Sequence, residues 1–469
     1  FLSMRLSTGS LAGTRVAVDP TTSGRTEEQV VNHVRMVLYE TKNNTVRYSW
    51  DLNVSTDGMN EFTGGDVVRG EDVPSATPTV SRFVTVGREV VKQDYELLIL
   101  INPPGELLEI TEQGNPRSYL SRAANMTKES LIQPYGIAAD NNFYMTNHQD
   151  LIFVPEVELR DNQRMAEENP VRVEVERAVA KVVVSGVPEV VPHGDRIDNL
   201  KWGLDVTNMY TYWMRKMTFI ANSGGVPNEM EQLNAGYREE RYAEDPNFTR
   251  FSSWNGGNPV GQFEYLSGTP ELSKNFDDYD YTLDAADQRH DVTTRVVISG
   301  TYTPNGFGSV ATRNGGGISF YYFKGNAIRV EAMRDMVNDR GQIPQELRDA
   351  GLEQAIENVL AWNPNAFNSP TASFSEGGIN FYYQGVCYYT VLIRHFSNNM
   401  VPVLMGYGRY GVVRNNVYQL SINKIIGPGQ PVINPPGTDP DDEDTSWISA
   451  DVNIMRWYIR NQNKFFLIN

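Results

Sequence analysis

The sequence holds 469 residues, which is longer than one hydrophobic core usually organises, so we expect two domains. Hydrophobic residues make up 40% of the chain and aromatic residues 11%, a composition that excludes a disordered chain and favours β-strands. Lys and Arg number 41 against 58 Asp and Glu, and the resulting net charge of −17 repels phosphate backbones, which excludes nucleic acid as a partner.

The single cysteine, Cys387, lies in an apolar run and is expected to be buried. One cysteine can form neither an intrachain disulfide nor a thiolate metal site. No stretch approaches the roughly 20 apolar residues that cross a bilayer, and the longest run, residues 97–101, is typical of a buried strand. The sequence therefore predicts no transmembrane helix.

The first predicted element is an amphipathic strand at the start of the sequence. Leu2, Met4 and Leu6 alternate with polar residues, which is the period of a half-buried strand. A polar stretch with scattered Gly and Arg residues follows, from 9 to 26. Its composition predicts an exposed segment between the first strand and the rest of the chain.

Most other predicted elements are short strands separated by clusters of Gly, Pro, Asn and Asp. Helical spacing predicts only two helices, over residues 116–132 and 342–362. A strand pattern through 171–184 ends at Ser185-Gly186 and a pair of prolines, where we place the boundary between the two domains. The clearest strand patterns cover residues 34–39, 81–86, 95–101, 143–147, 171–184, 200–206, 295–302, 317–323, 379–396 and 416–426.

The end of the chain combines a linker with a strand pattern. Residues 428–446 are rich in Pro, Gly and acidic residues and cannot fold on their own, so they predict an extended linker. In the tail, residues 447–469, apolar and polar residues alternate until the pattern slips to the opposite face after Ile454. A strand-forming segment on a flexible linker requires an acceptor sheet. The apolar positions of the tail strand are Ile448, Ala450, Val452, Ile454, Trp457 and Ile459.

The motifs of common enzyme and metal sites are absent from the sequence. Its five histidines are scattered singly, and no nucleophile elbow, P-loop or dinucleotide-binding fingerprint occurs. The acidic run from 277 to 282 lacks the glycine and the closing glutamate of a calcium loop. Carboxylates are plentiful, but nothing singles out a glycosidase pair. We therefore expect no enzyme, no cofactor and no metal site.

Six short segments stand in a fixed order along the whole chain. They are Leu2 to Leu6 with Gly13-Thr14-Arg15, Tyr144 to Asn147, Glu176 to Val182, Leu200 to Trp202, Val413 to Tyr418, and the linker with its terminal strand. Each segment alone is a weak signal, but in this order and spacing they resemble the fimbrillins of type V pili from Bacteroidia, and most closely those of the minor-fimbria shaft.

The resemblance implies an all-β protein built from two β-sandwich domains of transthyretin-like topology, with a few short helices and a C-terminal donor strand on a flexible linker. It divides the chain into an N-terminal strand removed on maturation (1–15), an N-terminal domain (16–187), a C-terminal domain (188–427), the linker (428–446) and the donor strand (447–469). This division agrees with the strand patterns and with the boundary derived from them.

Members of this family are exported as lipoproteins, and an arginine-specific surface protease then removes a short N-terminal segment. Carried over to this chain, the cut falls between Arg15 and Val16, with Arg25 as a rival site in an equally polar stretch. Loss of the first strand would leave an unpaired edge lined with apolar surface. The tail of the next subunit is expected to fill this groove by strand addition, which gives an open head-to-tail polymer.

The expected function is that of a structural shaft subunit of a surface pilus that supports adhesion, coaggregation or biofilm formation. Its expected partners are identical subunits, pilus anchor and tip subunits, the arginine-specific protease, and host or bacterial surface receptors. Two alternatives stay open: an accessory tip adhesin of the same pilus, and a glycan-binding surface lipoprotein, which the seven Trp and many Tyr residues suggest. We expect the protein in the fimbrium at the cell surface, after export through the outer membrane as a lipoprotein precursor.

Overall fold

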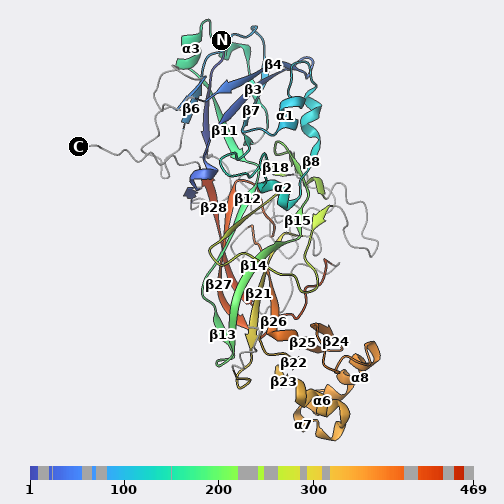
Figure 1. Ribbon diagram of the computed structural model, residues 1–469. Coiled ribbons are helices and arrows are strands. Elements are labelled where there is room, and N and C mark those ends of the chain that lie inside the picture. Colours follow the sequence, from blue (N-terminus) through green and yellow to red (C-terminus); the bar gives the residue numbers. More distant parts are fainter. Residues whose placement is uncertain are drawn as a thin grey trace, which may run out of the picture.

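The protein is all-β and elongated, with one β-rich part at the end that holds the N-terminus and a second part below it (Figure 1). The computed structural model describes residues 1–8, 21–23, 25–54, 66–69, 82–148, 150–219, 241–243, 245–247, 262–285, 293–308, 317–395, 410–436 and 448–458. Within these ranges the helices are short, and none is long and apolar enough to cross a membrane.

The N-terminal part is built on one mixed sheet. Its strands are β1 (Met4–Thr8), β3 (His33–Glu40), β4 (Val46–Asn53), β5 (Val67–Arg69), β6 (Arg82–Thr85), β7 (Tyr95–Ile101), β9 (Met145–Asn147), β10 (Ile152–Val154) and β11 (Val171–Arg177). Across the sheet they lie in the order β4-β3-β7-β9-β11-β1-β6-β5, with β10 beside β7. Every pair is antiparallel except β1 with β11, which run parallel.

The interior strands of this sheet are apolar along most of their length. β3 and β7 bury residues on both faces, whereas the edge strand β4 has several exposed positions. One hydrophobic core forms around the sheet, and Met4 and Leu6 of β1 belong to it together with Ile99 of β7. The short helix α1 (Gly105–Ile110) adds the buried Leu107 to the same core.

The C-terminal part has two main sheets. The first contains β2 (Thr21–Ser23), β12 (Ala180–Ser185), β13 (Glu189–Val191), β20 (Tyr279–Thr282), β27 (Asn416–Ile426) and β28 (Ile448–Tyr458), and the second contains β14 (Arg196–Asp205), β21 (Arg295–Thr303) and β26 (Val386–Leu392). Their orders are β2-β28-β27-β12-β20, with β13 beside β27, and β14-β21-β26. Val182 and Leu420 of the first sheet share one buried cluster with Trp202 and Ile298 of the second, as in a sandwich.

A compact module interrupts the second of these sheets between β21 and β26. It comprises β22 (Phe320–Phe323), β23 (Asn326–Arg329), α6 (Val330–Asn338), α7 (Gln345–Asp349), α8 (Leu352–Trp362), β24 (Phe374–Glu376) and β25 (Ile379–Tyr382). Tyr321, Ile356 and Phe381 lie in a hydrophobic core that belongs to this module. The module sits at the end of the molecule opposite the N-terminus (Figure 1).

Smaller elements lie around and between the two parts. One of the strand pairs, β8 (Ala123–Asn125) with β16 (Tyr210–Tyr212), links the N-terminal part to the C-terminal part. The others are β15 (Thr207–Asn208) with β19 (Phe263–Glu264) and β17 (Met217–Phe219) with β18 (Arg241–Ala243), and the remaining short helices are α2 (Lys128–Ile132) and α3 (Gln163–Glu168).

Both predicted helices are wrong in extent. Residues 116–132 form a 3-10 turn, β8 and α2 in succession, because pairing of β8 with β16 overrides the helical spacing. Residues 342–362 are divided into α7 and α8, because Pro344 lacks an N–H donor and Gly351 adopts a left-handed φ of 91° between the two helices. Helix α6 was not predicted.

The chain passes from the sheet of the N-terminal part into the sheet that holds β27 and β28 where β11 ends and β12 begins. Asn415 holds this crossing: its backbone N–H donates to the carbonyl of Val179 at 2.9 Å, and its side-chain oxygen accepts from the N–H of Arg177 at 3.3 Å. The predicted boundary at 187/188 lies beyond the crossing, between β12 and β13, because the strand pattern through 171–184 belongs to two sheets. The division into domains remains a prediction.

Candidate functional site

Strand β1 lies inside the sheet of the N-terminal part, between β11 and β6. Leu2, Met4 and Leu6, the side chains predicted to be displaced, are each no more than 1% exposed. The hydroxyl of Ser3 donates to the carbonyl of Thr85 at 2.6 Å, which fixes the start of the strand. Removal of β1 would therefore leave two unpaired edges, one on β11 and one on β6, with an apolar floor between them.

The tail strand β28 lies on the second part of the same chain. It pairs antiparallel with β27 from Ile448, opposite Ile425, to Arg456, opposite Asn416. Ile448 is 8% exposed, and Ala450 packs against the same core. The two strands that the sequence singles out thus lie in different sheets of one subunit. Of the other predicted donor positions, β28 contains Val452, Ile454 and Trp457, and Ile459 lies outside the described residues.

One residue interrupts the pairing of β27 with β28. Asn423 of β27 lies at a register shift, and its side-chain amide donates to the carboxylate of Asp451 at 2.7 Å. In the sequence, the apolar residues of the tail change to the opposite face after Ile454. The pairing of β28 with β27 has no shift at that position and continues to Arg456. The extra residue of this strand pair is Asn423 of β27, and the segments of β27 before and after it both pair with β28.

Strand β2 is the outermost strand of the sheet that holds the tail. It runs parallel to β28, with Thr22 opposite Trp457. In the sequence, β2 begins a few residues after the predicted cleavage site. The two residues of that site, Arg15 and Val16, lie outside the described residues. The segment downstream of the predicted cut thus contacts the strand that is predicted to be donated.

Arg25, the rival processing site, is held by several neighbours. Its guanidinium forms ion pairs with Glu28 at 3.2 Å and with Asp140 at 2.6 Å, and it lies 4.3 Å above the centre of the Tyr279 ring. Its backbone N–H donates to the carboxylate of Glu28 at 2.7 Å. An arginine-specific protease binds the arginine side chain in its specificity pocket, so the contacts of Arg25 would have to break before cleavage.

Glu28 holds the segment that contains Arg25 against strands of both parts of the molecule. Its buried carboxylate accepts from Nζ of Lys181 at 2.6 Å and from the hydroxyl of Tyr281 at 2.5 Å. Its backbone carbonyl accepts from Nη2 of Arg177 at 3.1 Å. Burial raises the pKa of Glu28, but the charge and hydrogen bond of Lys181, followed by the hydrogen bond of Tyr281, outweigh burial and hold this pKa below its ordinary value.

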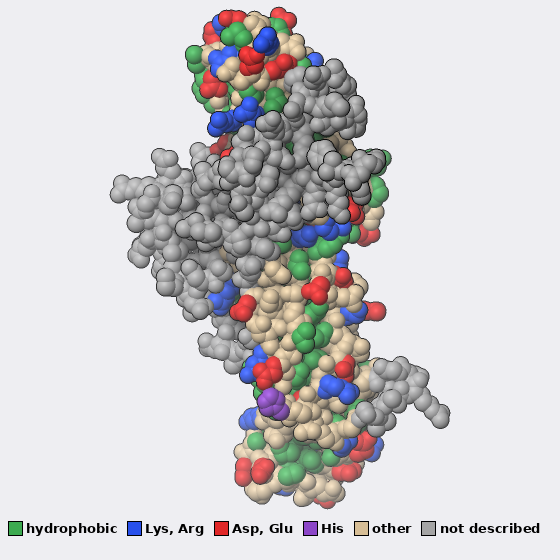
Figure 2. All heavy atoms as spheres, turned by 90° about the vertical axis from the view of Figure 1, so that its left-hand side faces the viewer, with side chains coloured by type: hydrophobic (Ala, Val, Ile, Leu, Met, Phe, Trp, Pro, Cys, Tyr) green, Lys and Arg blue, Asp and Glu red, His purple; other side chains and the backbone are tan. Residues whose placement is uncertain are grey.

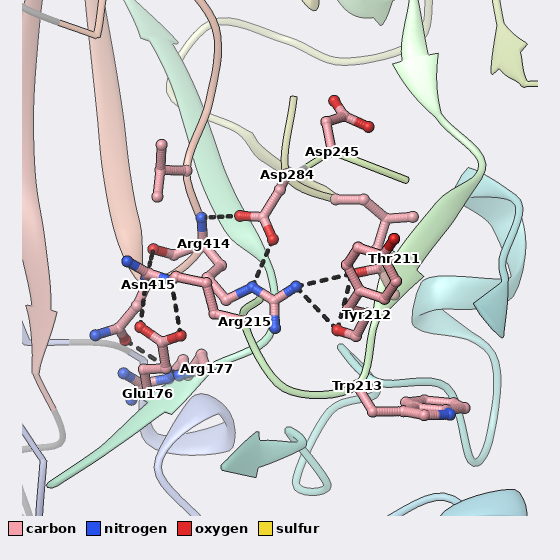
Figure 3. Close-up of polar contacts among 12 residues, drawn as sticks. Glu176, Arg177, Thr211, Tyr212, Trp213, Arg215, Asp245, Asp284, Arg414 and Asn415 are labelled. Carbon is pink, nitrogen blue, oxygen red and sulfur yellow. Dashed lines mark hydrogen bonds and ion pairs between the residues drawn. The ribbon is translucent and has the colours of Figure 1, made fainter. Parts of the chain in front are cut away.

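A second buried network surrounds Arg414, directly before β27 (Figure 3). Nε of Arg414 donates to Oδ2 of Asp284 at 2.5 Å, and the two side chains are 2% and 7% exposed. Nη2 of Arg414 donates to the hydroxyl of Thr211 at 2.8 Å and to the carbonyl of Tyr212 at 3.0 Å. Burial alone would lower the pKa of Arg414, but the charge of Asp284 raises it above its ordinary value, so the guanidinium stays charged.

The same network reaches the end of β11. Glu176 accepts from Nε of Arg215 at 3.0 Å and from its Nη2, and Nδ1 of His148 lies 2.9 Å from the same carboxylate. Nη2 of Arg215 also donates to the carbonyl of Arg414 at 3.4 Å, which connects the two ion pairs. Charged groups from β11 and from the segment before β27 therefore meet where the two parts of the molecule join.

Sequence profiles of two families match the two regions that carry the terminal strands. The family described as Major fimbrial subunit protein (FimA) matches residues 1–177, which include β1 and both strands beside it. The family described as Major fimbrial subunit protein type IV, Fimbrillin, C-terminal, matches residues 380–463, which include β27 and β28. The chain belongs to the fimbrillin family. No curated protein sequence matches this fimbrillin.

Solved structures of other proteins match this fimbrillin over almost its whole length, including the following two. A fimbrilin, FimA, from Porphyromonas gingivalis is 13% identical, with a TM-score of 0.43 and coverage of 98% of both chains. The tip fimbrial protein Mfa3 from the same organism, with a C-terminal truncation, is 10% identical, with a TM-score of 0.35 and coverage of 97% of this chain and 100% of the other.

The matched families are families of fimbrial structural proteins and not of enzymes. Membership places this fimbrillin in a fimbrium at the cell surface, where it assembles with other fimbrial subunits. In the parts of the chain that the structure describes, no group of His, Cys, Asp and Glu side chains could hold a metal ion. Cys387 is buried, and burial raises the pKa of its thiol to about 12, which makes it unreactive at neutral pH.

Sequence reasoning found the terminal strands and missed the charged networks. Buried charges were not predicted, because a sequence does not say which distant side chains neutralise them. Two of the segments that carry the family resemblance, Glu176 to Val182 and Val413 to Tyr418, meet where the two parts join. The available signal was Arg177, which falls on the apolar face of the alternation formed by Val171, Val173 and Val175, and Lys181, which lies inside the apolar run 178–184.

Proposed function

We propose that this fimbrillin is a shaft subunit of a type V pilus, of the minor-fimbria kind, and that a protease-triggered strand exchange polymerises it. The observation that carries the proposal is the place of β1, a buried strand between two other strands at the start of the chain. The tail strand β28 has the same alternation of apolar and polar residues and follows the linker 428–446. Each subunit therefore holds one strand that can be removed and one that can replace it.

In this proposal the unprocessed subunit keeps both strands in its own sheets. Cleavage between Arg15 and Val16 releases β1, and the tail of another subunit then leaves its own β27 and enters the slot. On its own subunit β28 has β27 on one side and only the short β2 on the other. In the slot it would pair with β11 and β6 and cover the apolar floor, which favours exchange once β1 is gone.

The contacts of Arg25 favour Arg15 as the processing site. The guanidinium of Arg25 is tied to Glu28 and Asp140, and its own backbone N–H is bonded to the Glu28 carboxylate. Cleavage after Arg25 would also detach β2 from the rest of the chain. A cut at Arg15 removes β1 and leaves both β2 and this anchor in place.

Further parts of the proposal rest on the resemblance to the fimbrillins of type V pili. In the proposal, the precursor is a lipoprotein exported through the outer membrane, with a two-domain body divided into residues 16–187 and 188–427. Its partners beyond identical copies are the anchor and tip subunits of the pilus, the arginine-specific protease, and host or bacterial receptors. The tip adhesin remains the alternative function, but a tip subunit has no need to donate a strand, so β28 and its linker favour the shaft.

The test is digestion of the full chain with an arginine-specific protease, with N-terminal sequencing and an assay for SDS-resistant ladders. The matched variants are Arg15→Ala, Arg25→Ala and a deletion of residues 447–469. We expect a new N-terminus at Val16 and ladders from the wild type and from Arg25→Ala. Arg15→Ala should stay uncut and monomeric, and the deletion variant should be cut without forming ladders.

Two results would contradict the proposal. Ladders that form equally well without residues 447–469 would exclude the tail as the donor. Clean cleavage at Arg15 that leaves the wild type permanently monomeric would instead favour the tip adhesin.

A further inference from the structure

Large hydrophobic side chains are exposed at the end of the molecule that holds the N-terminus. Val91 is 50% exposed, Phe153 58%, Val157 79% and Met165 42%. Figure 2 shows hydrophobic side chains among charged ones at this end and also at the opposite end. Isolated exposed apolar residues are ordinary, so the question is whether these four share one surface.

Hydrogen bonds and ion pairs join the segments that carry these four residues. Lys92 forms an ion pair with Asp161 at 3.5 Å, and Asp94 accepts from the backbone N–H of Glu156 at 2.8 Å. The backbone N–H of Gly87 donates to the carboxylate of Glu167 in α3 at 3.0 Å. The loop 87–94 and residues 153–168 therefore form one surface, which we call the N-terminal pole.

The opposite end of the C-terminal part also exposes apolar side chains. Val187 is 96% exposed in the turn before β13, and Ile426 is 42% exposed at the end of β27. β13 pairs with β27 directly beside them, and the N–H of Gly427 donates to the carbonyl of Val191 at 2.8 Å. We call this surface, residues 187–191 with 424–427, the C-terminal pole.

The directions of the two terminal strands relate these poles. Phe1 exchanges backbone hydrogen bonds with Arg160 at the N-terminal pole, and β1 runs from there to Thr8, opposite Val175 near the end of β11. A tail that takes over the pairings of β1 must therefore enter its acceptor at the N-terminal pole. The tail strand itself begins at the C-terminal pole, where Ile448 lies opposite Ile425.

We propose that the C-terminal pole of one subunit packs against the N-terminal pole of the next copy in the polymer, with Val187 and Ile426 facing Phe153 and Val157. This inference rests on the proposed strand exchange, which sets the direction of the tail. Gln430 and Ile433 of the predicted linker exchange backbone hydrogen bonds with Tyr388 and Gly268 of their own subunit, which leaves residues 437–447 to span the gap between subunits. Eleven residues reach at most roughly 40 Å, so the donor cannot stay far from its acceptor. The occupant of each apolar pole is thus a second copy of this chain, and the contact adds to the strand in the slot.

The experiment places a charge on each pole and compares it with a charge at an exposed site elsewhere. The variants are Val157→Glu and Val187→Glu, and the matched control is Tyr135→Glu, because Tyr135 is 86% exposed and lies after α2, outside both poles. Readouts are cleavage at Arg15, binding of a synthetic peptide of residues 447–469 to the cleaved subunit, and the rate of ladder formation.

We expect all three variants to be cleaved and to bind the peptide within about twofold of the wild type. Ladder formation should slow at least about tenfold for Val157→Glu and Val187→Glu, and it should be unchanged for Tyr135→Glu. As a direct check of contact, cleaved Val157→Cys and Val187→Cys subunits are mixed and treated with a short bismaleimide. A crosslink should form between the two variants and should not form when Tyr135→Cys replaces Val157→Cys.

The outcomes separate this inference from the proposed function. Peptide binding and wild-type ladders from both pole variants, without the crosslink, would overturn the pole contact and leave strand exchange standing. A peptide that binds none of the cleaved subunits would overturn strand exchange, and the pole contact with it.

Discussion

At the scale of single residues, buried charges are the most constrained features of this fimbrillin. A charge taken out of water is costly unless it is paired and hydrogen-bonded. Arg414 meets both conditions through Asp284, Thr211 and Tyr212, and Glu28 meets them through Lys181 and the hydroxyl of Tyr281. Each pair joins segments that are far apart in sequence, so loss of one member takes the directly bonded counter-charge away from the other in a buried site.

We therefore expect Asp284→Asn to lower the free energy of unfolding by about 3 kcal/mol or more, because it leaves the buried Arg414 guanidinium without its directly bonded counter-charge. The matched control is Arg164→Ala, which removes an exposed ion pair with Glu168 whose side chains are 86% and 56% exposed. That change should have little effect on stability, because an ion pair this exposed is screened by solvent. Urea unfolding followed by tryptophan fluorescence measures both, and equal losses would show that the Arg414 pair is not a stabilising contact.

The pKa of Glu28 gives a prediction about pH. Because its folded pKa lies below its unfolded value, its stabilisation is complete above the unfolded pKa, near 4.5, and is lost as the pH falls through the folded pKa. Glu28→Gln should therefore be clearly less stable than the wild type at pH 7, and the difference should shrink below about pH 4. Thermal unfolding of both proteins between pH 3 and pH 7 tests this, and a difference that stays constant over the range would contradict it.

At the scale of elements, the proposal requires β28 to leave β27. Ser421 and Asp451 lie opposite each other in this pair, and Asp451 is exposed. Paired residues on antiparallel strands have Cα atoms about 4.5 to 5.5 Å apart, which suits a disulfide. We expect the oxidised double variant Ser421→Cys/Asp451→Cys to be cleaved by the protease. In the absence of wild-type subunits it should stay monomeric, because the disulfide holds β28 on β27.

Reduction of the same sample should restore ladders, and each single cysteine variant should polymerise with or without a reductant. Cys387 does not interfere, because its thiol is buried. Ladders from the fully oxidised protein would show that Ile448–Tyr458 stays on its own subunit and that another segment is donated.

Elements were predicted correctly from the sequence where a local pattern of apolar residues matches the burial of the strand. Leu2, Met4 and Leu6 alternate, and all three are buried. It failed where contacts distant in the chain decide the local structure, as in residues 116–132, where pairing of β8 with β16 replaces a helix. The charged networks depend on pairs such as Arg414 with Asp284, which no local pattern reveals.

At the scale of the whole molecule, the N-terminal part depends on β1 for its integrity. Burial of Leu2, Met4 and Leu6 contributes about 1.5 to 3 kcal/mol each before ordering costs. A protein that begins at Val16 and lacks the tail, residues 447–469, should therefore unfold at a temperature at least about 6 °C lower than the same tail-deleted protein with residues 1–15 in place. Differential scanning calorimetry measures the shift.

The tail peptide, residues 447–469, should restore the lost stability of the shortened protein when added in excess, because a ligand that binds only the folded state raises its unfolding temperature. A scrambled peptide of the same composition is the control. An unchanged transition with the tail peptide would mean that the vacated slot does not accept it.

The direct passage of the chain from β11 into β12 has a mechanical consequence. β11 borders the slot that would receive a neighbour's strand, and β12 pairs with β27, the strand from which the subunit's own tail departs. Tension along a fibre would therefore run through one continuous backbone, held at its crossing by Asn415. Force along strands loads many ladder hydrogen bonds together rather than one after another, so a shaft built this way would resist pulling better than peeling.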